Sequence, residues 1–113
     1  MKVIYNSVIP LKGFRAINLF GIIFARKEAT PLSDTGKNHE AIHTEQMKET
    51  GYIGFYLIYI AEFLLLWCRM KDAELAYFAI RFEKEAYRNQ HNKDYIRGRR
   101  KYAWRRLPDI LKL

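Results

Sequence analysis

Apolar residues follow two different patterns along this chain, and the pattern changes after about residue 36. Residues 2–9 carry Val, Ile and Tyr among polar positions and stop at Pro10, which predicts a strand. Residues 14–26 are apolar on both parities, with three isoleucines and three phenylalanines. This second pattern predicts one long buried strand that bulges at Gly21, with a turn at residues 10–13 before it.

The rest of the chain is predicted to be helical after a loop at residues 27–37, which contains Pro, Ser, Asp and Gly. The first helix would begin at Asn38, a good N-cap, and stop at Gly51. Pro108 would close the last helix. The four predicted helices span residues 38–51, 52–68, 71–90 and 93–107.

The helix at residues 52–68 is strongly apolar, and Glu62 is its only charged residue. Its length is at the lower limit for a membrane-spanning helix, and a carboxylate at the bilayer centre would cost about 3 kcal/mol. A helix buried in the protein core is therefore favoured, and association with a membrane surface stays open as an alternative. Tyr52, Tyr56, Tyr59 and Glu62 lie on one stripe of this helix.

These patterns predict a single α+β domain over residues 1–113. Residues 1–36 would supply strands and a loop that form a short N-terminal β-hairpin or small sheet, and residues 37–113 would supply about four α-helices. Half of the residues are apolar, which favours a compact fold over a disordered chain.

The formal net charge of +8 changes this picture at the C-terminal end, where basic residues gather. With Tyr102 and Trp104 among them, they suggest binding to nucleic acid, anionic lipid or an acidic partner as one alternative function. Nucleic-acid binding is not favoured, because the same helix carries an apolar stripe and its arginines fit a solvated face. The basic residues are Arg97, Arg99, Arg100, Lys101, Arg105 and Arg106.

The single cysteine, Cys68, cannot form an internal disulfide and is expected to be a small buried apolar residue. The N-terminal residues lack the continuous apolar segment and cleavage site of a secretory signal. We therefore expect a cytoplasmic location, with peripheral membrane association as an alternative.

The strongest chemical signal is an HExxH motif formed by His39, Glu40 and His43. Two histidines four residues apart lie one turn apart on the same helix face, so both imidazoles can reach one metal ion. Glu40 can stand beside the ion and act as a general base towards a metal-bound water. The motif predicts a zinc-dependent hydrolase with one Zn²⁺ per chain.

A catalytic zinc site usually needs a third protein ligand. Glu83 is the preferred candidate, because it shares a helix face with several alanines and its burial there would require a positive partner. Glu85 points about 200° away from Glu83 and would serve as a supporting charge. Glu62 is a second alternative, although it could equally pair with a buried arginine or tyrosine. His91 lies in a polar segment that is typical of a solvated histidine.

The motif His39-Glu40-Ala41-Ile42-His43 followed by Glu83-Lys84-Glu85-Ala86-Tyr87 resembles the gluzincin class of zinc metallopeptidases, in particular its minimal single-domain members. The resemblance implies a zincin-like fold with the HExxH motif on its first helix. It implies that His39, His43 and Glu83 bind zinc and that Glu40 is the general base. It also implies an extended peptide substrate bound along the strand at residues 14–26.

The chain departs from the gluzincin pattern at Tyr87, where that class often has an aspartate that orients a zinc-bound histidine. A neutral tyrosine cannot replace an anionic acceptor, but Tyr87 could donate a hydrogen bond to a substrate oxygen as a catalytic residue. The expected partner is a peptide or protein substrate, and a domain this small could need a partner protein to complete its cleft. The main alternative is a catalytically silent zinc-binding interaction module.

Overall fold

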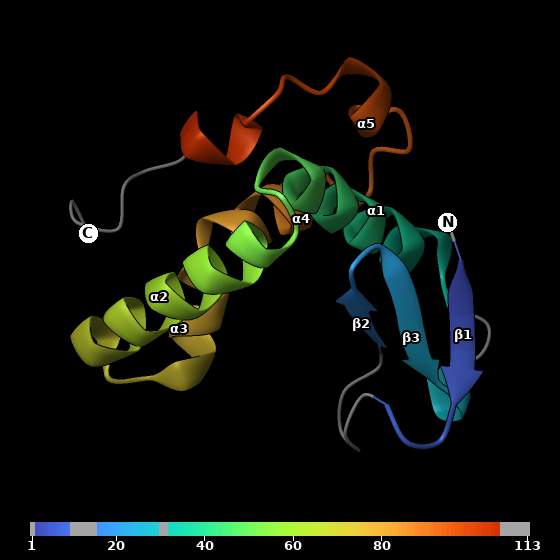
Figure 1. Ribbon diagram of the computed structural model, residues 1–113, viewed down its shortest axis with the longest axis horizontal. Coiled ribbons are helices and arrows are strands. Elements are labelled where there is room, and N and C mark those ends of the chain that lie inside the picture. Colours follow the sequence, from blue (N-terminus) through green and yellow to red (C-terminus); the bar gives the residue numbers. More distant parts are fainter. Residues whose placement is uncertain (1, 10–15, 30–31, 107–113) are drawn as a thin grey trace.

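The computed structural model describes residues 2–9, 16–29 and 32–106, so the turn predicted at 10–13 and the stop predicted at Pro108 lie outside the described residues. In this part of the chain a small three-stranded sheet precedes a set of helices (Figure 1). The prediction of an α+β fold is confirmed at this level. The helical elements are α1 (Asp34–Glu49), α2 (Ile53–Met70), α3 (Ala73–Ala79), α4 (Arg81–Asn89) and α5 (Tyr95–Gly98), with short 3-10 turns η1 (Lys27–Ala29) and η2 (Ala103–Arg106).

The sheet consists of β1 (Val3–Asn6), β2 (Ala16–Leu19) and β3 (Ile22–Arg26) in the order β1-β3-β2. β1 runs parallel to β3, and β2 runs antiparallel to it. The prediction of one long strand across residues 14–26 is wrong over the described part, because Phe20 and Gly21 have φ values of 55° and 91° and turn the chain back on itself. Positive φ at both central residues is the geometry of a tight hairpin turn.

The HExxH residues lie within α1, which begins earlier than the sequence indicated. Ser33 is the N-cap, and its side chain accepts a hydrogen bond from the backbone N–H of Gly36. Asn38 was the predicted cap, but it lies inside the helix, and its amide instead donates to the carbonyl oxygens of Asn89 and Gln90. It therefore ties α1 to the C-terminal end of α4.

The helix predicted at residues 71–90 is broken into α3 and α4 at Ile80, whose backbone is extended. The break has a clear cause. Glu62 accepts a hydrogen bond from the backbone N–H of Arg81 and two more from its guanidinium group. A continuous helix would direct that N–H to the carbonyl of Tyr77, four residues earlier, so the ion pair replaces a helical bond.

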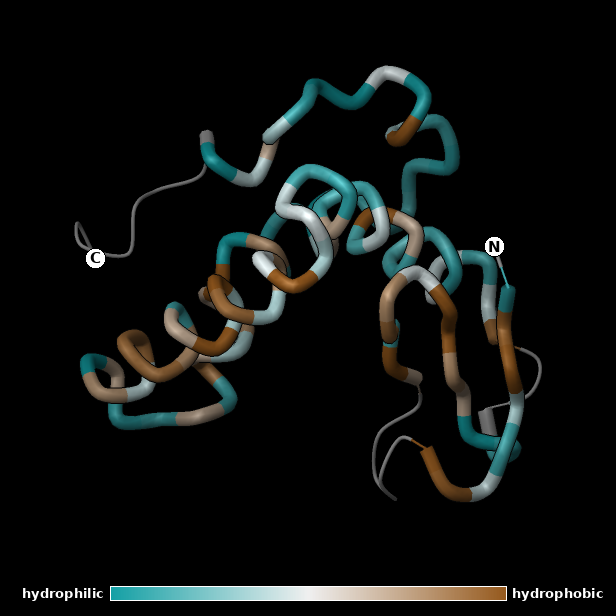
Figure 2. Tube along the Cα trace, viewed as in Figure 1, coloured by the Kyte–Doolittle hydropathy of each residue, from teal (hydrophilic) through white to brown (hydrophobic). Residues whose placement is uncertain are grey.

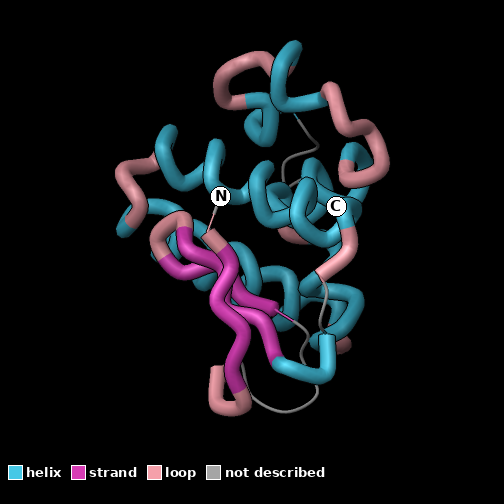
Figure 3. The backbone as a smooth tube through the Cα atoms, turned by 90° about the vertical axis from the view of Figure 1, so that its right-hand side faces the viewer, coloured by secondary structure: helices cyan, strands magenta, loops and turns pink. Residues whose placement is uncertain are grey.

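The predicted fourth helix, at residues 93–107, is also wrong in extent, since in its described part, up to residue 106, only the four residues of α5 are α-helical and η2 follows after an extended link. Figure 3 shows these C-terminal elements as short helical segments joined by loops. Trp104 is buried against Phe82, with their ring centroids 4.7 Å apart. It is therefore a core residue and does not provide the exposed stacking surface that was considered for nucleic-acid binding.

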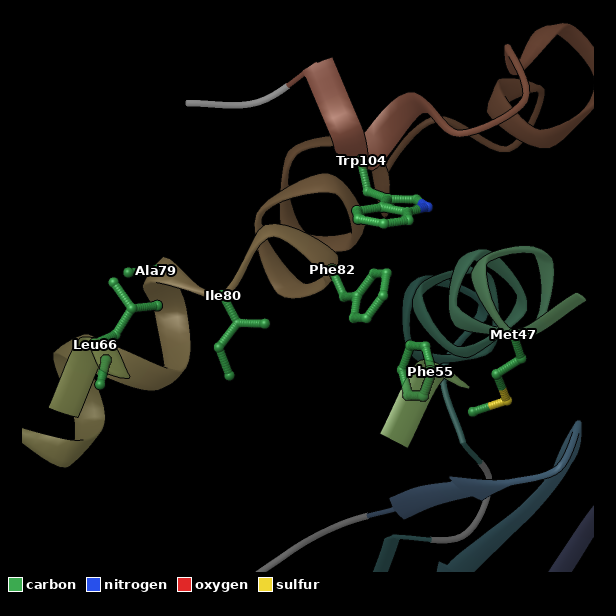
Figure 4. Close-up of a cluster of buried hydrophobic side chains, with 8 residues drawn as sticks. Met47, Phe55, Leu66, Ala79, Ile80, Phe82 and Trp104 are labelled. Carbon is green, nitrogen blue, oxygen red and sulfur yellow. The ribbon is translucent and has the colours of Figure 1, made fainter. Parts of the chain in front are cut away.

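The main core lies between α1, α2, α3, α4 and η2 (Figure 4). Phe55 and Phe82 stack at its centre, with ring centroids 4.5 Å apart. The sheet packs near α1, and Tyr56 of α2 fixes the β2–β3 turn by accepting from the N–H of Phe20 and donating to the carbonyl of Asn18. The buried apolar residues of the main core are Met47, Phe55, Leu66, Ala76, Ala79, Ile80, Phe82 and Trp104.

Helix α2 is not the buried core helix that its composition predicted. Of its 18 residues only Phe55, Glu62 and Leu66 are buried. Cys68, also expected to be buried, is exposed. Among the described residues, α2 is the one helix long and apolar enough to cross a membrane, judged by length and composition. Figure 2 shows it as a mainly hydrophobic segment along the outside of the helical part.

Candidate metal centre

The two motif histidines occupy neighbouring turns of α1 and point into the space between α1 and α4. His39 and His43 are both buried, and their ring centroids lie 4.8 Å apart. This approach follows from the four-residue spacing on a regular helix. Phe55 packs against the His43 ring at a centroid distance of 5.8 Å and closes one side of the centre.

Glu83 reaches both histidines from α4. Its Oε1 lies 3.1 Å from Nε2 of His39 and 3.0 Å from Nε2 of His43, and the two Nε2 atoms are 3.2 Å apart. These three atoms form a nearly equilateral triangle. Two of its corners come from α1 and one from α4, about forty positions later in the sequence, so the packing of the two helices assembles it.

Each histidine is oriented by a glutamine that the sequence analysis did not identify. The Oε1 atom of Gln46 lies 2.8 Å from Nδ1 of His43, and the Oε1 atom of Gln90 lies 2.8 Å from Nδ1 of His39. An amide oxygen can only accept a hydrogen bond, so both Nδ1 atoms carry the proton and the Nε2 atoms of the neutral rings have free lone pairs. Gln46 follows His43 by three residues on the same helix face, and this spacing was the available signal.

The orientation of Gln46 is fixed by its own hydrogen bonds. Its amide nitrogen donates to the carbonyl oxygen of Phe82 at 3.0 Å and to Oε1 of Glu85 at 2.9 Å, so its oxygen must face His43. Glu83 is held in a similar way, because the hydroxyl of Tyr59 donates to its Oε2 at 2.7 Å. Tyr59 thus leaves Oε1 of Glu83 directed at the histidines.

Three acceptor atoms therefore converge, and this arrangement favours a cation between them. Burial lowers the pKa of His43, but the charge and hydrogen bond of Glu83 outweigh it and raise that pKa to about 9. Burial raises the pKa of Glu83, but the charge of His43, the close approach of both histidine rings and the hydrogen bond from Tyr59 hold it well below its usual range. A proton or a metal ion can satisfy the same set of acceptors.

Glu40 stands beside this triangle on α1 and is half-buried. Ligand atoms of His39, Glu40 and His43 all lie within 4.8 Å of one another, and this group could hold a metal ion. Burial raises the pKa of the Glu40 carboxyl, against the opposing influence of the two histidines. The backbone carbonyl of Glu40 accepts a hydrogen bond from Asn18 of β2, which joins the motif helix to the sheet.

The two alternative carboxylates are held by arginines. Glu62 is paired with Arg81, as the sequence allowed. Glu85 is paired with Arg99, which also pairs with Glu49 through both of its terminal nitrogens. Glu85 accepts a hydrogen bond from the amide of Gln46, so it supports the centre indirectly, through the residue that orients His43.

The remaining candidates lie at the rim of the centre. The Tyr87 ring packs edge-on against His39 at a centroid distance of 4.5 Å. Its hydroxyl forms a 2.9 Å hydrogen bond with the hydroxyl of Tyr77, and the residue is partly exposed. His91 is exposed, and its Nε2 lies 3.5 Å from the amide nitrogen of Gln90.

Comparison with known proteins gives no match: no family model, no curated protein and no solved structure is similar to this chain. The function of the centre must therefore be inferred from the residues and geometry of this chain.

Proposed function

We propose that this chain is a small zinc-dependent peptidase of the gluzincin type, in which His39, His43 and Glu83 bind one zinc ion and Glu40 is the general base. The observation that carries the proposal is the triangle of ligand atoms, with sides of 3.0, 3.1 and 3.2 Å. Ligand atoms of a tetrahedral zinc site with bonds of about 2.0–2.1 Å lie roughly 3.3 Å apart. The triangle is within a few tenths of an ångström of that spacing.

The choice of donor atoms supports the same metal. Two neutral imidazoles and one carboxylate are a ligand set that catalytic zinc sites use. The glutamine partners of both Nδ1 atoms supply the supporting hydrogen bonds that zinc-bound histidines usually have, although here from amides rather than carboxylates. These amides take over the orienting role that the resemblance assigned to an aspartate at the position of Tyr87.

When bound, zinc supplies Lewis acidity and lowers the pKa of coordinated water towards neutrality. Glu40 takes one proton from the attacking water, whose oxygen bonds to the peptide carbonyl carbon. The C–N bond then breaks as Glu40 returns the proton to the amine nitrogen. Burial raises the pKa of Glu40, which brings it nearer to the value at which a carboxylate both accepts and returns a proton at neutral pH.

The substrate is proposed to be an extended peptide lying along β2. In the described residues β2 pairs only with β3, and Asn18 anchors it to α1 by donating to the carbonyl of Glu40 and to the hydroxyl of Thr44. A peptide added to this strand would gain main-chain hydrogen bonds close to the metal centre. Tyr87, at the rim beside His39, is proposed to donate a hydrogen bond to a substrate oxygen.

Metal content is the first test of this proposal. Protein purified without added metal and then reconstituted should bind about one zinc per chain, measured by elemental analysis. The substitutions His39→Ala, His43→Ala and Glu83→Ala should each remove it. No zinc after reconstitution, or zinc retained in Glu83→Ala and lost in Glu62→Ala, would contradict the assigned ligand set.

The substitution Glu40→Gln separates an enzyme from a catalytically silent zinc-binding module. It should lower hydrolysis of a peptide library by roughly 10²–10⁴ while zinc binding is kept, because only proton transfer is lost. Glu45→Gln is the matched control on the same helix and should leave hydrolysis unchanged. A zinc-binding chain with no hydrolytic activity in any form would favour the silent module.

A further inference from the structure

The outward side of α2 is a continuous apolar surface. At 100° per residue, eight side chains on this helix lie within an arc of about 160°. No charged residue lies among them between Ile53 and Cys68. We call this surface the outer face of α2, and its members are Ile53, Leu57, Ile60, Ala61, Leu64, Leu65, Trp67 and Cys68.

The exposure of the outer face is high for a helix of this composition. Ile53 and Leu57 are each 66% exposed, and Leu64 is 50% exposed. Only 17% of the residues in α2 are buried within the protein. The neighbouring α3 adds Leu75 and Phe78 as further exposed apolar residues. A contiguous row of exposed large apolar side chains, unlike single scattered ones, indicates a binding surface.

The inner face of α2 excludes the simplest explanation, that the helix spans a bilayer. Glu62, near the middle of the helix, is buried in its ion pair with Arg81. The Tyr59 hydroxyl donates a hydrogen bond to Glu83, and the Tyr56 hydroxyl donates one to the backbone carbonyl of Asn18 in β2. Spanning would place this ion pair, the metal centre and a sheet edge at the depth of the hydrocarbon, which is energetically costly. The helix is therefore suited to lie on a membrane and not to cross it.

The charge of the chain distinguishes a bilayer from a second copy of the same protein. The net charge of +8 attracts an anionic lipid surface and makes two copies repel each other. The outer face also lacks polar groups that would fix a protein partner in one orientation, whereas protein interfaces carry a polar rim and about one hydrogen bond per 100–200 Å². An apolar stripe on a cationic molecule matches the chemistry of an anionic membrane surface.

We propose that this protein binds peripherally to anionic membranes, with α2 parallel to the surface and its outer face inserted among the acyl chains. Tyr59 and Glu62 lie on the opposite side of the helix, so membrane binding leaves the metal centre accessible. The proposal stands independently of the peptidase assignment, because the outer face and the zinc ligands share no residue.

The test is co-sedimentation of the full chain with vesicles of phosphatidylcholine containing roughly one-third phosphatidylserine. The wild-type protein should bind, and binding should weaken with added salt and with phosphatidylcholine alone. The double variant Leu57→Gln/Leu64→Gln should bind at least about tenfold more weakly, because two apolar side chains no longer insert. Val8→Gln, which changes a 72% exposed apolar residue elsewhere, is the matched control and should bind as wild type.

Tryptophan fluorescence adds a readout of insertion, since Trp67 is on the outer face and Trp104 is already buried. Vesicles should shift the emission of the wild-type protein to shorter wavelength, and Trp67→Phe should abolish the shift. No binding of the wild type, or equal binding by the double variant, would overturn the proposal. A stable dimer that the double variant dissociates would also overturn it and would assign the outer face to a second copy.

Discussion

At the scale of single residues, the state of the candidate centre depends on whether a proton or a metal lies among three acceptors. Gln90 fixes the proton of His39 on Nδ1, and Gln46 does the same for His43. Both Nε2 atoms therefore face Oε1 of Glu83. Without a cation these acceptors would repel one another. Glu83 raises the pKa of His43 to about 9, so we expect the metal-free protein to keep a proton among these atoms at neutral pH.

This shift predicts the pH dependence of the metal-free protein. The pKa of His43 is about 9 when folded, compared with 6.5 for an ordinary histidine. Because the folded value is higher, the stabilisation is complete below pH 6.5 and is lost as the pH rises through 9. The free energy of unfolding, measured by urea denaturation with a chelator present, should fall by at most about 3 kcal/mol over this range.

The exposed His91 gives the control for this measurement. His91→Gln should keep the same loss of stability between pH 6.5 and 9, whereas His43→Gln should remove most of it. An identical pH dependence in His43→Gln and wild type would show that His43 does not hold the proton.

At the scale of elements, one buried arginine joins three helices behind the centre. Arg99, which follows α5, pairs with Glu49 of α1 and Glu85 of α4, and its side chain is only 4% exposed. Tyr95 of α5 also donates to Glu85. Through Gln46 this network reaches His43, so the C-terminal elements help to position a residue of the candidate metal centre.

The substitution Arg99→Met should therefore be severe. It would leave the buried carboxylate of Glu85 and the partly buried one of Glu49 without their positive partner, and breaking a buried pair costs about 3–5 kcal/mol. The free energy of unfolding from denaturant titration should fall by about this amount. Arg100→Met removes the same charge from an exposed position next along the chain and should change stability by less than about 0.5 kcal/mol. A similar small effect for both variants would show that the network does not stabilise the fold.

At the scale of the whole molecule, metal binding should connect parts of the chain that are distant in sequence. The proposed ligands belong to α1 and α4, and β2 is anchored to α1 through Asn18. A ligand that binds only the folded chain stabilises it by mass action, whatever the details of the chemistry.

Zinc at roughly a hundred times its dissociation constant should add about 2.7 kcal/mol to the free energy of unfolding and raise the midpoint of thermal unfolding by about 10 °C. Calorimetry with and without a chelator measures this shift. Glu83→Gln should show no zinc-dependent shift, and Glu74→Gln, an exposed carboxylate on α3, should show the full one. A full shift in Glu83→Gln would mean that zinc binds elsewhere.

The sequence by itself determined the α+β class, the HExxH spacing and the expectation that Glu83, rather than Glu85, lies beside the motif histidines. These follow from local rules, because helix periodicity fixes which side chains share a face, and a carboxylate on an apolar face needs a positive partner. The same rules could not place Gln90, which reaches His39 across 51 residues of sequence. They also missed the β2–β3 turn, since positive φ at Phe20 is unusual for an aromatic residue and is supported by Tyr56 from α2.

Only the tertiary structure decided which apolar segments are inside. Apart from Glu62 and Arg69, residues 53–70 carry apolar or aromatic side chains on every side, so their composition could not distinguish a core helix from a helix with one face open. Burial depends on which neighbours cover each face, and in this protein α3 and α4 cover only one side of α2. In the same way, the break at Ile80 depends on Glu62, a residue of another helix, and no pattern within residues 71–90 could have predicted it.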